Sequence, residues 1–142
     1  VRRATGATIM VDEGCHGSAD LHRVVGPRAA DLANIKPMEG GGMGGAVEMD
    51  AIAAAAGIGS QIGTMVESSI ASAAGLHVAL ARGNVQSVEM GGPLLLAEDV
   101  GDLAGMYDGC RVTVPDGAGL GIVPDLDNVR RFAASWYEIG PD

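Results

Sequence analysis

The sequence predicts an α/β fold in which parallel β-strands alternate with α-helices, as in one half of a (β/α) TIM-type barrel. Short apolar runs alternate with helical patterns along most of the chain. Glycine or proline ends each helical pattern before the next apolar run begins. Charged residues close four of the apolar runs at intervals of roughly 20–30 residues, the length of one βα unit. These charged residues are Asp12-Glu13, Lys36, Glu67 and Glu89.

The first two strand–helix units come from residues 7–56. Residues 7–12 are an apolar run, and Ser18 can cap a helix that Gly26-Pro27 ends, because proline cannot continue a helix. The second strand is predicted at residues 32–36. Helical spacing of apolar residues then predicts a helix over residues 45–56, which Gly57 ends.

The remaining elements follow the same logic. Residues 60–66 and 85–88 are predicted strands, and the helix between them, residues 70–82, is capped by Ser68-Ser69. Residues 112–114 are expected to form a short strand before the turn at 115–117. Asp125 or Asp127 can cap a last helix that runs through Phe132 to Trp136.

Four βα units are half of an eight-unit barrel, which needs roughly 250 residues. A half-barrel alone would leave two sheet edges open. We therefore expect residues 1–142 to be the C-terminal half of a larger barrel domain whose N-terminal half lies outside this sequence. The intact mass of the native protein should then exceed twice the 14.3 kDa of this chain.

Composition excludes several classes of partner. The formal net charge of −9 argues against nucleic acid and against anionic membranes, since both require a basic surface. Cys15 and Cys110 lie far apart and fit a reducing cytoplasm. The run of residues 51–56 is too short to span a bilayer.

Four stretches at the strand ends carry specific motifs: Ile9-Met10-Val11-Asp12-Glu13, Asn34-Ile35-Lys36, Gly63-Thr64-Met65-Val66-Glu67-Ser68-Ser69-Ile70 and Glu89-Met90-Gly91-Gly92-Pro93-Leu94-Leu95-Leu96. These stretches resemble barrel strands five to eight of the enolase superfamily, with the muconate cycloisomerase branch and its mandelate racemase-like relatives as the nearest group. The later stretch Val114-Pro115-Asp116-Gly117-Ala118-Gly119-Leu120-Gly121-Ile122 resembles the segment that follows the last barrel strand in that branch. The stretches occur in the family's order over essentially the whole chain.

The resemblance implies a role for each charged residue. Asp12 matches a carboxylate ligand of a divalent metal, Mg²⁺ or Mn²⁺, and Glu13 is its acidic neighbour. Lys36 matches the catalytic lysine that moves a proton at the carbon next to the substrate carboxylate. Glu89 matches an acid near the substrate, and Glu67 a carboxylate whose role varies in this branch. The complete protein is then expected to be a cytoplasmic homo-oligomeric enzyme acting on a small carboxylate.

Several alternatives stay open within and outside this family. Pro37 is reminiscent of succinylbenzoate synthases and N-acylamino acid racemases, whereas Glu89-Met90-Gly91 replaces the Asp-x-Asp of dipeptide epimerases. Gly40-x-Gly42-x-x-Gly45 formally matches a dinucleotide-binding loop. A non-catalytic half-barrel module is a third reading. His16, in the loop after Asp12-Glu13, could also reach the mouth of the barrel.

Overall fold

The computed structural model describes residues 1–135. The last helix was expected to continue to Trp136, which lies outside this range, but it already ends at Phe132, because Ala133 has an extended backbone. The elements of the structure, in chain order, are α1 (Arg2–Thr5), β1 (Met10–Val11), α2 (Ser18–Val25), β2 (Leu32–Ile35), α3 (Gly42–Ala55), β3 (Gly59–Ile62), α4 (Ser69–Ala81), β4 (Val85–Val88), the 3₁₀ helices η1 (Gly92–Leu95) and η2 (Ala104–Met106), β5 (Tyr107–Asp108), β6 (Arg111–Val112) and α5 (Leu126–Phe132).

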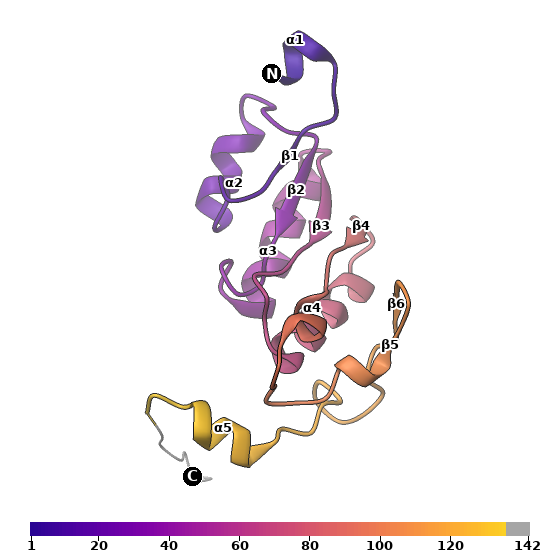
Figure 1. Cartoon of the computed structure of the whole chain (residues 1–142). Helices are drawn as coiled ribbons and strands as arrows, with labels where there is room; N and C mark the ends of the chain where they lie inside the picture. Colours follow the sequence, from indigo (N-terminus) through magenta and orange to yellow (C-terminus); the bar gives the residue numbers. More distant parts are fainter. Residues whose placement is uncertain (136–142) are drawn as a thin grey trace.

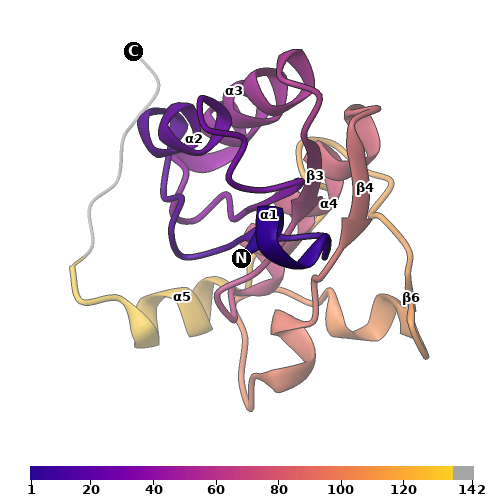
Figure 2. The same ribbon diagram turned by 90° about the horizontal axis from the view of Figure 1, so that it is seen from above.

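Four parallel strands form the main sheet, in the order β1-β2-β3-β4, which confirms the predicted alternation. Each connection between neighbouring strands passes through one helix, because parallel strands need a crossover. Helices α2, α3 and α4 follow one another along the sheet (Figure 1), and the view from above shows α2 and α3 side by side on one side of the strands (Figure 2). This arrangement matches part of a (β/α) barrel.

Alternation along each strand divides the side chains between the two faces of the sheet. Ala33, Ile35 and Ile62 are fully buried and belong to the core with residues of the helices such as Met49 and Leu76. The core is aliphatic, as the composition indicates. On the inner face of the sheet, away from these helices, Asn34, Gln61 and Ser87 lie side by side in the register, whereas the neighbouring pair of Met10 and Leu32 is apolar.

Several local expectations were wrong. The first strand, expected at residues 7–12, is limited to Met10–Val11. The third strand ends at Ile62 instead of residue 66, and Val66 has a positive φ of 65°, which no strand accommodates. The start of α4 is not capped by a side chain of Ser68. Asp99, 30 residues further along the chain, accepts hydrogen bonds from Ser69 N and Ser69 Oγ at 2.9 and 2.7 Å.

The C-terminal third adds a hairpin and a short helix outside the main sheet. The short strand expected at residues 112–114 is displaced to Arg111–Val112, which is β6 and pairs antiparallel with β5. Tyr107 of this hairpin donates its hydroxyl hydrogen bond to the carbonyl of Met90. Asp125 caps α5 by accepting from the backbone N–H groups of Asp127 and Asn128, so it is Asp125 and not Asp127 that caps this helix. Within residues 1–135, every helix is too short or too polar to cross a membrane.

One buried carboxylate ties the helix layer to the sheet. Asp50 of α3 is fully buried, and its carboxylate lies 2.7 Å from Arg82 Nε and accepts from Asn84 Nδ2 at 3.1 Å. The same Asn84 amide also donates to Ser60 Oγ of β3. Burial opposes ionisation of Asp50, but the hydrogen bonds from Arg82, Ser60 and Asn84 outweigh it and lower the pKa of this carboxyl.

Replacing Asp50 by alanine should destabilise the fold by about 3 kcal/mol, the lower end for a buried ion pair that loses one partner. Urea unfolding at neutral pH measures this loss. The matched control is Asp127→Ala, which removes a 98% exposed carboxylate from a surface pair and should leave the midpoint nearly unchanged. Equal midpoints for the two variants would contradict the structural role of Asp50.

The stability that Asp50 contributes should depend on pH in one direction. Because its folded pKa lies below the ordinary value of about 3.9, the contribution is fully present above that value and is lost as the pH falls through the folded pKa. Asp50→Asn should therefore flatten the acid limb of stability against pH. Urea midpoints between pH 2 and 6 (roughly the range over which carboxylates titrate) measure the difference from wild type.

Candidate active site

Lys36 lies directly after β2 and is held between the two acidic residues that follow β1. Its Nζ is 2.7 Å from Asp12 Oδ1 and 2.5 Å from Glu13 Oε1. The Lys36 side chain is only 5% exposed, whereas the side chains of Asp12 and Glu13 are 46% and 63% exposed. The parallel pairing of β1 and β2 thus brings together three of the residues singled out from the sequence, at the carboxyl ends of the strands.

These contacts determine the charge state of the lysine. The hydrogen bonds to Asp12 and Glu13 raise the pKa of Lys36 above its ordinary value and outweigh the opposing effect of burial. The hydrogen bond from Lys36 in turn lowers the pKa of Asp12 and of Glu13. The cluster is therefore an ammonium between two carboxylates. For Lys36 to accept a proton, positive charge must first offset these carboxylates.

A row of polar side chains crosses the inner face of the sheet and ends on Asp12. Ser87 Oγ of β4 donates to Gln61 Oε1 of β3 at 2.6 Å, and Gln61 Nε2 donates to Asn34 Oδ1 of β2 at 3.3 Å. Asn34 Nδ2 donates to Asp12 Oδ1 at 3.1 Å. The sequence patterns did not single out Asn34, Gln61 or Ser87. A signal was present, because Asn34 and Ser87 each lie two positions before a candidate site residue and so share its face of the strand.

The other candidate residues lie further from this cluster. Glu89 follows β4 directly, is exposed, and accepts from Thr64 Oγ1 at 3.5 Å. Glu67 does not lie at a strand end, since β3 stops at Ile62. It is 3% exposed in the following loop, and its buried Oε2 has no hydrogen-bond partner among residues 1–135. His16 lies 4.0 Å from Glu39 and so bridges the loops after β1 and β2.

The glycine-rich segment after Lys36 is required by the backbone of its own turn. Gly41 and Gly42 have φ of 90° and 75°, the left-handed region that favours glycine. A Cβ at Gly45 would lie 1.7 Å from the carbonyl oxygen of Gly40. These steric demands explain why glycines occupy the positions of the dinucleotide-binding pattern, and no bound nucleotide is needed to explain them.

The residues at the strand ends fit part of a metal site. Asp12 offers a partly exposed carboxylate, the kind of hard oxygen donor that Mg²⁺ and Mn²⁺ prefer. Among residues 1–135, no group of three or more histidine, cysteine, aspartate or glutamate side chains is placed to hold an ion. The described residues therefore do not form a metal site by themselves.

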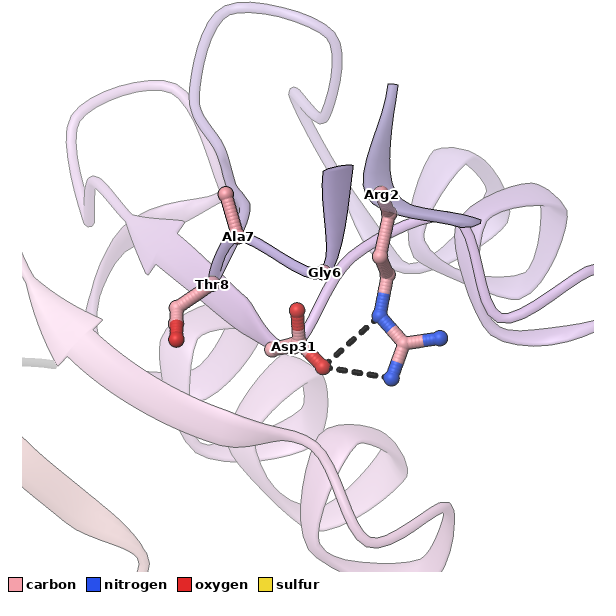
Figure 3. Close-up of a pocket in the computed structure, with 5 residues that line it drawn as sticks. All are labelled: Arg2, Gly6, Ala7, Thr8 and Asp31. Atoms are coloured by element: carbon pink, nitrogen blue, oxygen red, sulfur yellow. Dashed lines mark hydrogen bonds and ion pairs between the residues drawn. The ribbon is translucent and has the colours of Figure 1, made fainter. Parts of the chain in front are cut away.

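A cavity at the opposite end of the strands is separate from this chemistry. It is lined by Arg2, Thr8 and Asp31 together with Gly6 and Ala7 (Figure 3). Arg2 Nη2 lies 2.6 Å from Asp31 Oδ1, and Ile9 N donates to the other oxygen of Asp31 at 3.0 Å. Asp31 precedes β2, so this cavity lies at the amino-terminal ends of the strands, where barrels carry stabilising contacts instead of catalytic groups.

Comparison with known proteins identifies the family to which this chain belongs. The family model described as "Enolase C-terminal domain-like" matches residues 1–129. The chain belongs to this family, the C-terminal domain of the enolase superfamily. Members typically use a divalent metal.

The relatives are isomerases with different substrates. The chain is 40% identical over 132 residues to N-succinyl-L-Arg/Lys racemase of Bacillus cereus, an alignment covering 93% of this chain and 35% of the relative. It is 36% identical to chloromuconate cycloisomerase of Cupriavidus pinatubonensis, covering 94% of this chain and 36% of that protein. It is 35% identical to L-Ala-D/L-Glu epimerase of Bacillus subtilis, covering 87% and 34%.

Solved structures agree with the sequence relatives. The crystal structure of the Bacillus cereus racemase superposes with a TM-score of 0.87 at 39% identity, over 94% of this chain and 36% of that one. Muconate lactonizing enzyme superposes with a TM-score of 0.84 at 32% identity, over 92% and 37%. The chain thus spans about a third of the length of the relatives it matches.

Removing one carboxylate should make Lys36 easier to deprotonate in the metal-free protein. In Glu13→Gln the ammonium loses one of its two stabilising charges, so its pKa falls and the neutral amine fraction rises at any pH below that pKa. Lys36 is the only lysine in the sequence, which makes its acylation by an amine reagent easy to follow by mass spectrometry. The modification rate at a fixed alkaline pH should increase.

The matched control for this experiment is Glu39→Gln. Glu39 lies on the neighbouring loop but pairs with His16 and not with Lys36. Its substitution should leave the pH profile of Lys36 acylation unchanged. Indistinguishable profiles for Glu13→Gln and wild type would contradict the ion pair.

Proposed function

We propose that the complete protein containing this chain catalyses metal-assisted proton transfer at the carbon α to a carboxylate, as a cycloisomerase or racemase of the muconate cycloisomerase type. The observation that carries this proposal is the buried Lys36 ammonium, 2.7 Å from Asp12 Oδ1 at the carboxyl ends of parallel strands. Family membership supports the same reaction class, since the matched relatives are racemases, epimerases and cycloisomerases.

The charge balance at the strand ends supports a metal-dependent reaction. Asp12, Glu13 and Glu89 outnumber the single lysine there, so an anionic substrate would be repelled. A divalent cation, when bound, supplies positive charge to the substrate carboxylate and so acidifies the adjacent C–H bond. Asp12 would hold this cation together with ligands from the rest of the barrel.

Each residue then has a defined task. Lys36 takes or returns the proton at the α carbon, which requires that its ion pair with Asp12 and Glu13 be weakened when the cation shares Asp12. Glu13 keeps the lysine side chain oriented toward the mouth. Glu89, on the loop directly after β4, assists at the substrate. For Glu67 we propose a supporting role beneath the mouth, in keeping with its burial.

Two substrate classes are the main candidates. The first is lactonisation of a muconate, supported by the strand-end motifs and by the 36% identity to chloromuconate cycloisomerase. Racemisation of an N-acylated amino acid is the second, supported by Pro37 after the lysine and by the 40% identity to the N-succinyl-L-Arg/Lys racemase. Dipeptide epimerisation is less well supported, because Glu89-Met90-Gly91 lacks the paired aspartates.

Substituting Lys36 in the complete protein should abolish proton exchange without abolishing folding. In D₂O with Mg²⁺, the wild type should incorporate deuterium at the α carbon of its substrate, tested with muconate, N-succinyl amino acids and dipeptides and followed by NMR. Lys36→Arg keeps the positive charge but cannot act as a base, so the exchange rate should fall by about 10²–10⁴-fold. Retained exchange in this variant would overturn the role of Lys36.

The 142-residue chain by itself should bind Mn²⁺ weakly and turn over none of these substrates, because it supplies one metal ligand. Titration with Mn²⁺ and the same deuterium-exchange assay test this expectation. Turnover by the purified monomer would contradict it. Binding of NAD(H) to the glycine-rich loop would instead favour the dinucleotide alternative.

A further inference from the structure

Asn34 lies on the inner face of β2, two residues before Lys36 and beside Asp12 of the neighbouring strand end. We propose that Asn34 is a positioning residue that orients the Asp12 carboxylate for the metal, with Gln61 and Ser87 holding the Asn34 amide in place. This inference rests on the proposed function, because it assigns to Asp12 the role of a metal ligand.

The direction of the hydrogen bonds follows from chemistry. An ionised carboxylate only accepts, so Asn34 must present its NH₂ group to Asp12 and its carbonyl oxygen to Gln61. Gln61 must then donate its NH₂ group, which leaves its own carbonyl oxygen to accept from Ser87 Oγ. Every donor in the row points toward Asp12, and such chains strengthen one another by polarisation.

The Asn34 amide has little freedom to leave this position. The residue is 4% exposed. Gly63, just after β3, provides the space for the amide, because a Cβ at that position would lie 2.3 Å from Asn34 Oδ1. A buried amide that lost its contact to Asp12 would keep an unpaired donor, which costs about 1–3 kcal/mol.

Both close partners of Asp12 use the same oxygen. Lys36 Nζ and Asn34 Nδ2 lie 2.7 and 3.1 Å from Oδ1, and neither of these contacts involves Oδ2. These two contacts orient the Asp12 carboxylate. The Asp12 side chain is 46% exposed, so Oδ2 is available to bind a metal ion. Partners that orient a metal-binding carboxylate in this way typically contribute about 10–100-fold to metal affinity.

The test is the Mn²⁺ dissociation constant of the complete protein, obtained from the electron paramagnetic resonance signal of free Mn²⁺, and no substrate is needed. Asn34→Leu should weaken Mn²⁺ binding by about 10–100-fold. Gln61→Met, which removes the donor behind Asn34 without touching Asp12, should weaken it by a smaller factor in the same direction.

The matched control is Asn84→Leu, which removes a half-buried asparagine that donates to the carboxylate of a different aspartate, Asp50. This variant should lower the urea midpoint of the metal-free protein and leave the Mn²⁺ affinity unchanged. An Mn²⁺ affinity of Asn34→Leu within twofold of wild type would overturn the proposal. If Asn34→Leu does not fold, Gln61→Met decides in the same way, with unchanged affinity overturning it.

Asp12→Ala separates this inference from the proposed function. If Asp12→Ala weakens Mn²⁺ binding while Asn34→Leu does not, the positioning role fails and the metal ligand stands. If Asp12→Ala binds Mn²⁺ as the wild type does, the metal assignment itself fails and the positioning role fails with it. Weakening by both variants, together with normal affinity in Asn84→Leu, supports the proposal.

Discussion

Parallel pairing of β1 to β4 is the constraint from which the rest of the structure follows. Parallel strands cannot be joined by tight turns, so each pair requires a helix between its strands, and those helices bury the face formed by Ala33, Ile35 and Ile62. The same pairing places all carboxyl ends at one edge. The opposite face carries the polar side chains of Asn34, Gln61 and Ser87 from β2, β3 and β4.

Two aspartates show how this division separates stability from chemistry. Asp50, on the helix side, is fully buried, and its carboxylate is paired with Arg82 and Asn84. Its charge therefore stabilises the fold. Asp12, on the inner face, has a similar set of partners in Lys36 and Asn34 but is 46% exposed. Because Asp50 is fully enclosed by its partners, it forms a structural ion pair. Because Asp12 is partly exposed, it is a candidate metal ligand.

The strand–helix alternation, β4 and the Asp125 cap of α5 were predictable, because they depend on local patterns of apolar residues, glycine and capping groups. The end of β3 at Ile62 was not, because the strand-like pattern continues to Val66, whose φ of 65° is incompatible with a strand. The α4 cap was not either, because Asp99 reaches Ser69 from 30 residues away. Lys36, Asp12 and Glu13 could be predicted as neighbours from their shared place after parallel strands. Their roles, and that of Glu89, stay predictions.

By itself, the sequence determined the order of the strands and helices, the aliphatic core and the charged residues that close three of the four strands. Those properties arise from neighbours along the chain. Only the tertiary structure decided that the lysine is an ammonium shared by two carboxylates, that Glu67 is buried in a loop, and that Ser87, Gln61 and Asn34 form one row ending on Asp12. Each of these depends on the strand register, which brings together residues that are more than twenty positions apart.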